Sequence, residues 1–504
     1  PRLLRPAAWP PSPDRPRASP RRARAAPRGL AAVLSVDLLT GCETEGQSPP
    51  SGQLFFPTAM AIGPTGDVLY VANSNFDLRF NRGALHSYDL ARLNQLMDDC
   101  PRLVDDPANR ITSAGECQVL PLELEDRLAE LRQEDGRCEA VLTDQVQTGS
   151  FADGIAVAPD GRRLYLPMRG DANLTFVDTD ERGTLSCGGD AGAAVERCTE
   201  DFARVDESLA NERDVGLPND PVGVIAGPFA DLLPPGSAPV EGNYVLFAHR
   251  GGSASLFIDG DQPDRPRPRL LSSRGGRGAL LGDVTYDDAT GLGWLASAST
   301  LGVARFGIGV EVLEGGEGSF AQIERTQLFR TRTLVFEDLD TSRGFGDVRA
   351  FALDPRPDVR RAYLLNRTPN ALLVADPDAE LDRIRVLRRI PVGLGPSKLT
   401  VREFPTEGRT LAFVSCFDSQ DVWVIDVDLG ALVGVVRNLG GPFEIAVDVP
   451  RQRAYVLDFV ASTVRFVDLA PMFACLRGDL MAGAECSPQL LGLLGRPSAR
   501  DELN

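Results

Sequence analysis

Apolar and polar residues alternate along most of the chain in short runs that are bounded by turn residues. "LYVANSNFDL" at residues 69–78 is typical, because an apolar stretch with an aromatic residue passes into a polar turn. Similar runs begin at Leu164, Ala362 and Ala454. Alternation rich in Val, Ile, Phe and Tyr predicts β-strands. The recurrence of one strand-and-turn pattern predicts a repeat architecture.

A second alternating strand follows each of these runs and usually ends in Asp. Its copies lie at residues 85–89, 174–178, 255–259, 372–376, 422–426 and 464–468, with a degenerate copy at 302–307. The shortest interval, from Asp426 to Asp468, is 42 residues, which matches a propeller blade of about 40–45 residues. Four-stranded units arranged around an axis bury faces that one unit alone leaves exposed. The pattern predicts an all-β chain that forms a seven-bladed β-propeller with long loop insertions.

The aromatic-led strand carries a family resemblance. Tyr70-Val71-Ala72-Asn73 resembles the signature of the YVTN-type β-propeller repeat family, and the strands at Tyr363 and Tyr455 are weaker copies. Blades 3 and 4 match poorly, and blade 4 has Trp294 in place of Tyr and lacks the closing Asp. The resemblance covers about residues 55–500. It implies an extracytoplasmic propeller scaffold and brings no catalytic residues.

The N-terminal residues resemble a targeting signal. Residues 1–41 hold eight Arg, a short apolar run and the small residues before Cys42, which is the layout of a secretory signal. "LTGC" also resembles a bacterial lipobox, in which Cys42 becomes the lipidated first residue. We therefore expect a signal peptide at 1–41, a flexible tether at 42–53 and the propeller at 54–504. The expected location is the cell envelope of a bacterium, periplasmic or cell-surface, with a lipid anchor.

Charge narrows the classes of partner. The formal net charge is −18, and residues 1–41 carry eight Arg against Asp14 and Asp37, so residues 42–504 have a net charge near −24. An acidic body argues against nucleic acid, which needs a basic footprint, and against docking on anionic lipid through charge. We expect a monomer whose partner is an envelope protein or a glycan.

Long insertions interrupt three blades that are neighbours in a closed ring. They lie at about 91–138, 181–214 and 470–488, and they are expected to form a cap on one face. They contain most of the cysteines, which can pair in an exported chain. Cys187 with Cys198 and Cys475 with Cys486 are the expected disulfides. Cys100 with Cys117 is the third, with Cys117–Cys138 as its rival, whereas Cys416 is expected to be a free thiol.

The face opposite that cap gathers the candidate ligand-binding residues. Arg begins the equivalent loop in three blades, and carboxylates and the chain's only Lys lie near the start of the innermost strands. Carboxylates and Arg around an axial funnel could hold a cation or a polar ligand. The candidates on this face are Arg169, Arg250, Arg367, His249, Asp153, Asp283, Lys398 and Glu444. The alternative is that these are turn-capping and solvated loop residues.

Metal and catalytic signals are weak. His86 and His249 are the only histidines, and His86 is expected on the surface. No cysteine pair has zinc-ligand spacing, so no metal site is predicted. "DGDQPDRPRP" from Asp259 has the Asp density of a calcium loop without the spacing of an EF-hand, so calcium is only a weak alternative to no cofactor. We find no G-x-S-x-G, P-loop or H-E-x-x-H motif.

These features favour a membrane-tethered, non-catalytic binding or scaffold propeller. The alternative is an enzyme, either a propeller hydrolase of the lactonase type or a quinoprotein-like enzyme, which would use the axial funnel. Asp153, Asp283 and Glu444 are the carboxylates that could converge there. Fold analogy alone does not decide between the two.

Overall fold

The computed structural model describes residues 47–104, 117–119, 141–170, 172–189, 195–204, 217–238, 240–260, 267–274, 281–297, 302–313, 322–336, 346–378, 383–479 and 486–495. The signal peptide predicted at 1–41 and Cys42 lie outside these ranges, as do the side chains of Cys100, Cys117 and Cys138. The described residues belong to one compact unit, Gly46–Asn504. That unit includes residues 47–53 of the predicted tether, because Gly52 N donates to Gln145 Oε1 at 2.6 Å.

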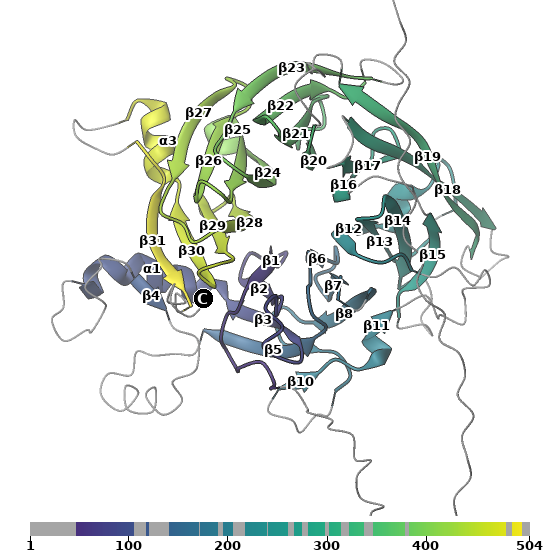
Figure 1. Ribbon diagram of the computed structural model, residues 1–504, viewed down its shortest axis with the longest axis horizontal. Coiled ribbons are helices and arrows are strands. Elements are labelled where there is room, and N and C mark those ends of the chain that lie inside the picture. Colours follow the sequence, from purple (N-terminus) through teal and green to yellow (C-terminus); the bar gives the residue numbers. More distant parts are fainter. Residues whose placement is uncertain are drawn as a thin grey trace, which may run out of the picture. The chain divides into compact units, whose positions relative to one another are not determined.

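Antiparallel sheets stand around an axis and form a seven-bladed β-propeller, as predicted (Figure 1). Each blade runs outward through consecutive strands. The strands of blades 1 to 3 are β1 (Pro57–Ile62), β2 (Val68–Asn73), β3 (Gly83–Asp89) and β5 (Leu142–Thr148); β6 (Ala156–Val157), β7 (Arg163–Met168), β8 (Asn173–Thr179), β9 (Leu185–Ser186) and β11 (Ala203–Arg204); β12 (Pro221–Pro228), β13 (Asn243–His249), β14 (Ser253–Asp259) and β15 (Arg269–Arg274).

The other four blades continue the same order around the ring. Their strands are β16 (Leu281–Asp287), β17 (Leu292–Ser297), β18 (Gly302–Leu313) and β19 (Gln322–Phe336); β20 (Val348–Leu353), β21 (Ala362–Arg367), β22 (Asn370–Asp376) and β23 (Arg383–Pro391); β24 (Pro396–Phe404), β25 (Arg409–Cys416), β26 (Asp421–Asp426) and β27 (Ala431–Val436); β28 (Pro442–Asp448), β29 (Arg453–Asp458), β30 (Thr463–Asp468) and β31 (Gln489–Leu494). The outer strand of blade 7 is β31, which consists of the apolar stretch "QLLGLL" near the C-terminus.

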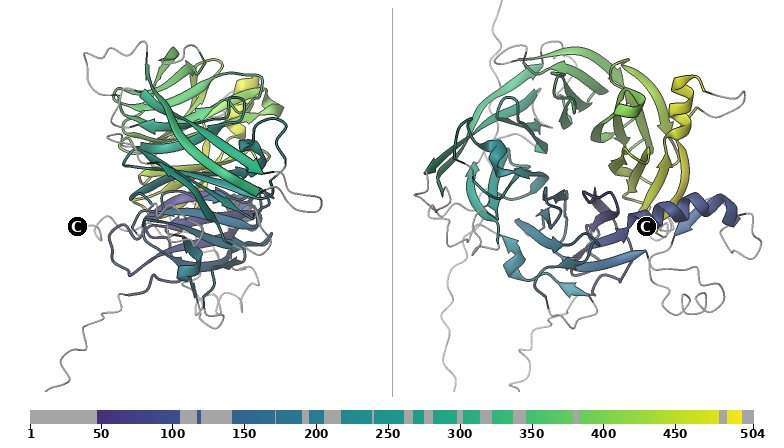
Figure 2. Two further views of the ribbon diagram at one scale, coloured as in Figure 1. Left: turned by 90° about the vertical axis from the view of Figure 1, so that its right-hand side faces the viewer. Right: turned by 180° about the vertical axis from the view of Figure 1, so that it is seen from behind.

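Short strands from the insertions extend neighbouring blades at their outer edges. β4 (Cys117–Val119) pairs in parallel with β31 of blade 7, and β10 (Glu196–Arg197) pairs in parallel with β5 of blade 1. The helices α1 (Leu90–Val104) and α3 (Ala470–Arg477) lie outside the ring (Figure 2). The described parts of the insertions therefore lie at the rim of the ring, where they join blades 7, 1 and 2, and do not cap a face.

The core consists of alternate strand residues packed between neighbouring blades. Tyr70, Tyr165, Tyr363 and Tyr455 of the second strands are almost fully buried, and Trp294 fills the equivalent place in blade 4. The Trp294 ring stacks on Phe351 of blade 5 with centroids 4.9 Å apart. The aromatic residue that defines the repeat is thus an inter-blade packing residue.

In the blades that have it, the Asp at or near the end of the third strand makes contacts within its own blade or with the neighbouring blade. Asp178 and Asp259 both accept from Arg163, at 2.6 and 2.9 Å. Asp426 accepts from Arg409 at 2.6 Å, and Asp468 accepts from the Ala470 N–H at 2.9 Å. These contacts tie each strand end to an adjacent strand or turn, which gives the repeated Asp a structural role.

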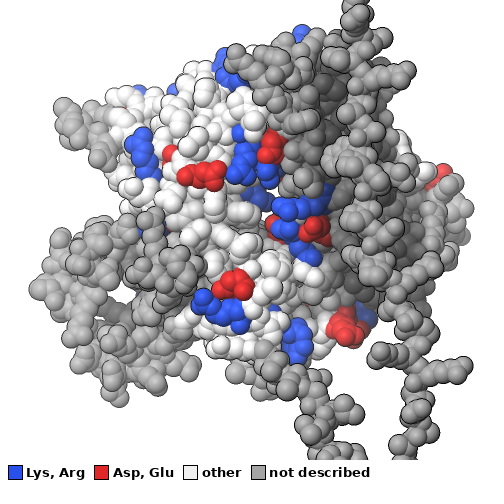
Figure 3. Space-filling view, in the orientation of Figure 1, with Lys and Arg blue, Asp and Glu red and all other residues white. Residues whose placement is uncertain are grey.

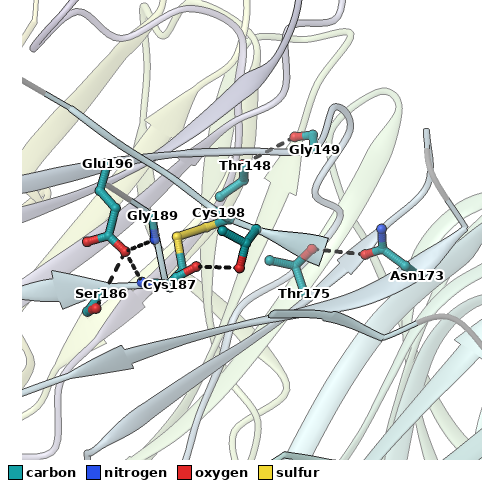
Figure 4. The surroundings of a disulfide bond; sticks show 10 residues. Thr148, Gly149, Asn173, Thr175, Ser186, Cys187, Gly189, Glu196 and Cys198 are labelled. Carbon is teal, nitrogen blue, oxygen red and sulfur yellow. Dashed lines mark hydrogen bonds between the residues drawn. A yellow bond between two sulfur atoms is a disulfide. The ribbon is translucent and has the colours of Figure 1, made fainter. Parts of the chain in front are cut away.

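Two of the predicted disulfides lie among the described residues: Cys187–Cys198 and Cys475–Cys486. Around the first, the Glu196 carboxylate accepts from the backbone N–H groups of Cys187 and Gly189 at 2.6 and 2.8 Å (Figure 4). Cys416 is a buried free thiol, and burial raises its pKa to about 12.

The prediction for His86 is wrong. Its side chain is fully buried on β3, where Nδ1 lies 2.9 Å from the Tyr88 hydroxyl oxygen. Burial lowers the pKa of His86 to about 3, so the imidazole is neutral at physiological pH. Alternation along β3 places His86 between two blades, where a neutral ring bonded to Tyr88 packs as a core residue.

Candidate functional site

The innermost strands begin with a shared irregularity that positions the axial side chains. In β1, β12, β16, β20, β24 and β28, two residues near the start of the strand lie opposite one residue of the next strand. Such a bulge bends a strand and redirects its side chains. In β16, β24 and β28 the residues that directly follow it are Asp283, Lys398 and Glu444.

These residues line an axial channel of about 1100 Å³ to which all seven blades contribute. Asp153, which precedes β6, joins them from blade 2. The Lys398 ammonium lies 3.4 Å from Glu444 Oε2, and each of these side chains is 17% exposed. Four of the predicted ligand-face residues therefore meet on the axis, although they come from four different blades. We call Asp153, Asp283, Lys398 and Glu444 the axial cluster.

Mutual charge and burial fix the protonation of the axial cluster. Burial alone would lower the pKa of Lys398, but Glu444, Asp283 and Asp153 outweigh it and raise that pKa. Burial raises the pKa of Asp283 to about 6, against the opposing effect of Lys398. The pKa of Asp153 is also raised, because burial outweighs Lys398, Arg169 and Arg250. Lys398 is thus a permanent cation among three carboxyl groups, one of which titrates near neutrality.

The three predicted Arg residues differ in their placement. Arg169 Nε donates to Asp220 Oδ1 at 3.0 Å, and its Nη1 lies 3.9 Å from Asp153 Oδ1, so Arg169 connects the loops to the axial cluster. Arg250 is exposed and close enough to lower the pKa of Asp153. Arg367 instead pairs with Asp418 at 3.1 Å.

His249 does not present its ring to the channel. It is the last residue of β13 and is fully buried, and its Nε2 lies 2.8 Å from the Ser255 hydroxyl oxygen. Burial lowers the pKa of His249 to about 4, against weaker raising effects of nearby backbone groups and Asp220. His249 is accordingly a neutral residue between strands rather than a ligand-face residue.

Sequence reasoning missed two parts of this site. Arg402 also lines the channel, since Lys398, Thr400 and Arg402 alternate on one face of β24. The alternation would have identified it. The second part is a group of phenylalanine side chains whose ring centroids lie 5.3–6.3 Å from a neighbour in the group. The group consists of Phe56, Phe76, Phe151, Phe417, Phe443 and Phe459, and we call it the aromatic group.

The aromatic group reaches the axial cluster at Phe443, whose ring centroid lies 5.9 Å from Lys398 Nζ. Its members come from blades 1, 2, 6 and 7, whereas Asp220 and Arg250 belong to blade 3 or the link before it, and Asp347 to the link before blade 5. The space-filling view shows basic and acidic side chains near the middle of one face, beside a broad uncharged area (Figure 3). The aromatic group therefore lies on the side of the mouth formed by blades 6, 7, 1 and 2.

Replacing Asp283 with Asn is expected to stabilise the protein at neutral pH. The folded-state pKa is about 6, above the ordinary value, so ionisation of Asp283 destabilises the fold as pH rises. We expect a gain of about 2 kcal/mol at pH 7.5 and none at pH 4. Urea unfolding of D283N and wild type at both pH values measures it. D418N, on a carboxylate with 51% exposure, is the control, and a gain independent of pH would contradict the assignment.

Among the described residues, no group of three or more His, Cys, Asp or Glu side chains is arranged to hold a metal ion. None of the helices in the described ranges combines the length and apolar character that a membrane crossing requires.

Comparison with known proteins gives fold-level similarity. No protein-family model matches the chain, and no curated protein matches it in sequence. Solved structures that it resembles include the periplasmic gluconolactonase of Pseudomonas aeruginosa, at 16% identity and a TM-score of 0.43 over 76% of this chain and 84% of that one. Hydrazine synthase of Kuenenia stuttgartiensis is 10% identical, with a TM-score of 0.44 over 82% of this chain and 95% of that one. The β-propeller domain of Cps50 (Swd1) from Myceliophteria thermophila is 9% identical, with a TM-score of 0.44 over 83% of this chain and 97% of that one. Identities this low carry no activity over to this chain.

Proposed function

We propose that this protein is a non-catalytic recognition propeller of the bacterial cell envelope, tethered through a lipid on Cys42, that binds a polyhydroxylated ligand such as a glycan at its axial mouth. The resemblance of the strands to the YVTN-type repeat and the lipobox-like "LTGC" support the lipid tether and the location in the cell envelope. The ligand class follows from the axial cluster, which offers an ammonium donor beside carboxylate acceptors, and from the guanidinium groups of Arg169 and Arg402 next to it. Hydroxyl groups both donate and accept, so they can satisfy both kinds.

The observation that carries the proposal is the position of Lys398. It is the only lysine of the chain, whose other 52 basic side chains are Arg, and it lies on the axis among three carboxylates. Ammonium is a compact point charge, whereas guanidinium is a planar fork, so the two are not interchangeable in a shaped site. A raised pKa keeps Lys398 protonated, which suits it to binding and not to nucleophilic attack, for which the pKa must be lowered.

A capture experiment tests this function. The immobilised protein is exposed to envelope extract, and retained glycans and proteins are identified for wild type, R169A and R367A. We expect R169A to lose the retained ligand, because Arg169 contacts the axial cluster, and R367A to keep it, because Arg367 pairs with Asp418 instead. Equal retention by all three proteins, or no retention by wild type, would contradict the proposal.

A hydrolase of the lactonase type is the second candidate, and one observation favours it. The pKa of about 6 for Asp283 suits proton transfer near neutral pH. Such an enzyme would consume sugar lactones, and D283N would abolish turnover. Recovery of the bound compound chemically unchanged from wild type favours recognition, whereas consumption that requires Asp283 favours the hydrolase.

A further inference from the structure

The loop between β2 and β3 exposes two large apolar side chains. Phe76 is 57% exposed and Leu78 is 65% exposed. Both residues follow the second strand of blade 1, so they lie at the end of the ring where the axial cluster is found. Single exposed apolar residues are ordinary, but two on one short loop, of which Phe76 belongs to the aromatic group, form a patch.

The surrounding contacts hold this patch outward. The Phe76 ring lies 5.3 Å from Phe459 and 6.1 Å from both Phe56 and Phe151, measured between centroids. The Asn75 side chain donates to Phe80 O at 2.7 Å and accepts from Phe80 N at 3.0 Å, which closes the loop. Leu78 has a positive φ of 54°, which is unusual for a bulky residue and marks a constrained loop. The fixed conformation of the loop therefore keeps Phe76 and Leu78 exposed.

The N-terminal segment leaves the propeller from the same loop. Gln47 O accepts from Asn81 N at 3.0 Å, three residues after Leu78. Cys42 precedes Gln47 by only five residues. An extended chain spans at most about 3.6 Å per residue, so Gln47 stays within about 18 Å of Cys42. A lipid on Cys42 would hold the Phe76 loop close to the bilayer surface.

We propose that Phe76 and Leu78 dock on the lipid surface beside the anchored Cys42, so that the axial mouth opens toward the membrane. This inference rests on the tether of the proposed function. Phenylalanine and leucine bury readily at the interface between headgroups and acyl chains, and a second contact adds to what a lipid anchor provides. A ligand of the axial mouth would then be reached at the membrane surface.

Charge contributes little to this docking. Arg79 in the same loop pairs with Asp77 at 3.2 Å, and the chain as a whole is strongly acidic. Docking through apolar side chains is insensitive to salt, whereas docking through basic residues weakens as salt screens it. We therefore expect docking on zwitterionic vesicles to be the same in low and in high salt.

Tryptophan fluorescence tests the inference in the lipidated protein, purified from membranes and reconstituted in phosphatidylcholine vesicles. Phe76→Trp is compared with Leu429→Trp, since both native side chains are 57% exposed and Leu429 lies in the turn after β26, at the opposite end of the ring. With brominated acyl chains, we expect about a twofold loss of the emission added by F76W, because interfacial side chains lie about 5–10 Å deep. L429W should lose almost none.

Three outcomes separate the tether from the docking. If brominated lipid quenches the added emission of F76W and L429W equally while the protein remains on the vesicles, the docking is wrong and the tether stands. A blue shift of F76W without bromolipid quenching would overturn it in favour of a protein contact. If mass spectrometry of the mature chain finds no lipid on Cys42, both the tether and this inference are wrong.

Discussion

Replacing Lys398 with Met is expected to lower the free energy of unfolding by about 3–5 kcal/mol at pH 8. Lys398 is the cation among Asp153, Asp283 and Glu444 in the axial channel. Its removal leaves carboxylates that burial already disfavours, and breaking a buried ion pair on one side costs more than the pair contributes when intact. Urea unfolding followed by circular dichroism measures the loss.

The loss in K398M should depend on pH in a defined direction. The pKa of Asp283 is about 6 in the folded wild type and that of Asp153 is raised, and Lys398 lowers both, so removal of the ammonium raises these two pKa values further. A carboxyl group whose folded pKa is raised destabilises the fold at high pH and ceases to do so as it protonates. The deficit should therefore shrink at pH 5. The control is R385M. The Arg385 side chain pairs with Asp376 and is 55% exposed, so this substitution should lower the free energy of unfolding by no more than about 0.5 kcal/mol. A pH-independent deficit would contradict the account.

Replacing Arg163 with Met should destabilise the protein by about 3 kcal/mol, because it breaks a contact between blades. Arg163 Nη1 donates to both oxygens of Asp259 at 2.9 Å, and Asp259 also accepts from the Tyr165 hydroxyl at 2.6 Å. Asp259 is only 5% exposed on its side chain, and burial raises its pKa in spite of Arg163. Without the guanidinium, its charge stays buried and uncompensated.

The double variant R163M/D259N is the control for this prediction. It removes both charges, so it should recover much of the stability that R163M loses. The Tyr165 hydroxyl can still donate to the carbonyl oxygen of the amide that replaces the carboxylate in D259N. Equal instability of the single and double variants would show that shape, not the buried charge of Asp259, accounts for the loss.

The fold could be predicted because the strand sequences themselves recur along the chain. Ala446 and Tyr455, which are nine residues apart in the sequence, form a cross-strand pair, as do Ala61 and Tyr70. The rim could not be predicted, since β4 and β10 are too short to give a periodic pattern and pair with strands of another blade. Such long-range pairing has no local sequence signal.

The candidate site was predictable in part for the same reason. Equivalent positions on the inner strands converge on an axis, so Asp283, Lys398 and Glu444 could be placed together from the repeat alone. Burial of His249 could not, because the last residue of a strand points inward or outward according to a register that only the paired strands fix. The aromatic group also escaped prediction, since Phe56, Phe151 and Phe459 lie in loops without periodicity.

The central claim is that the axial cluster binds a polyhydroxylated ligand, and one measurement tests it most directly. The melting temperature of wild type and D153N/D283N is recorded with a panel of neutral, amino and acidic saccharides, because a ligand that binds only the folded state raises it. D376N/D418N is the matched surface control. The account predicts that at least one class of saccharide raises the melting temperature of wild type and of the control but not of D153N/D283N. A panel that shifts none of the proteins, or shifts all of them equally, would contradict it.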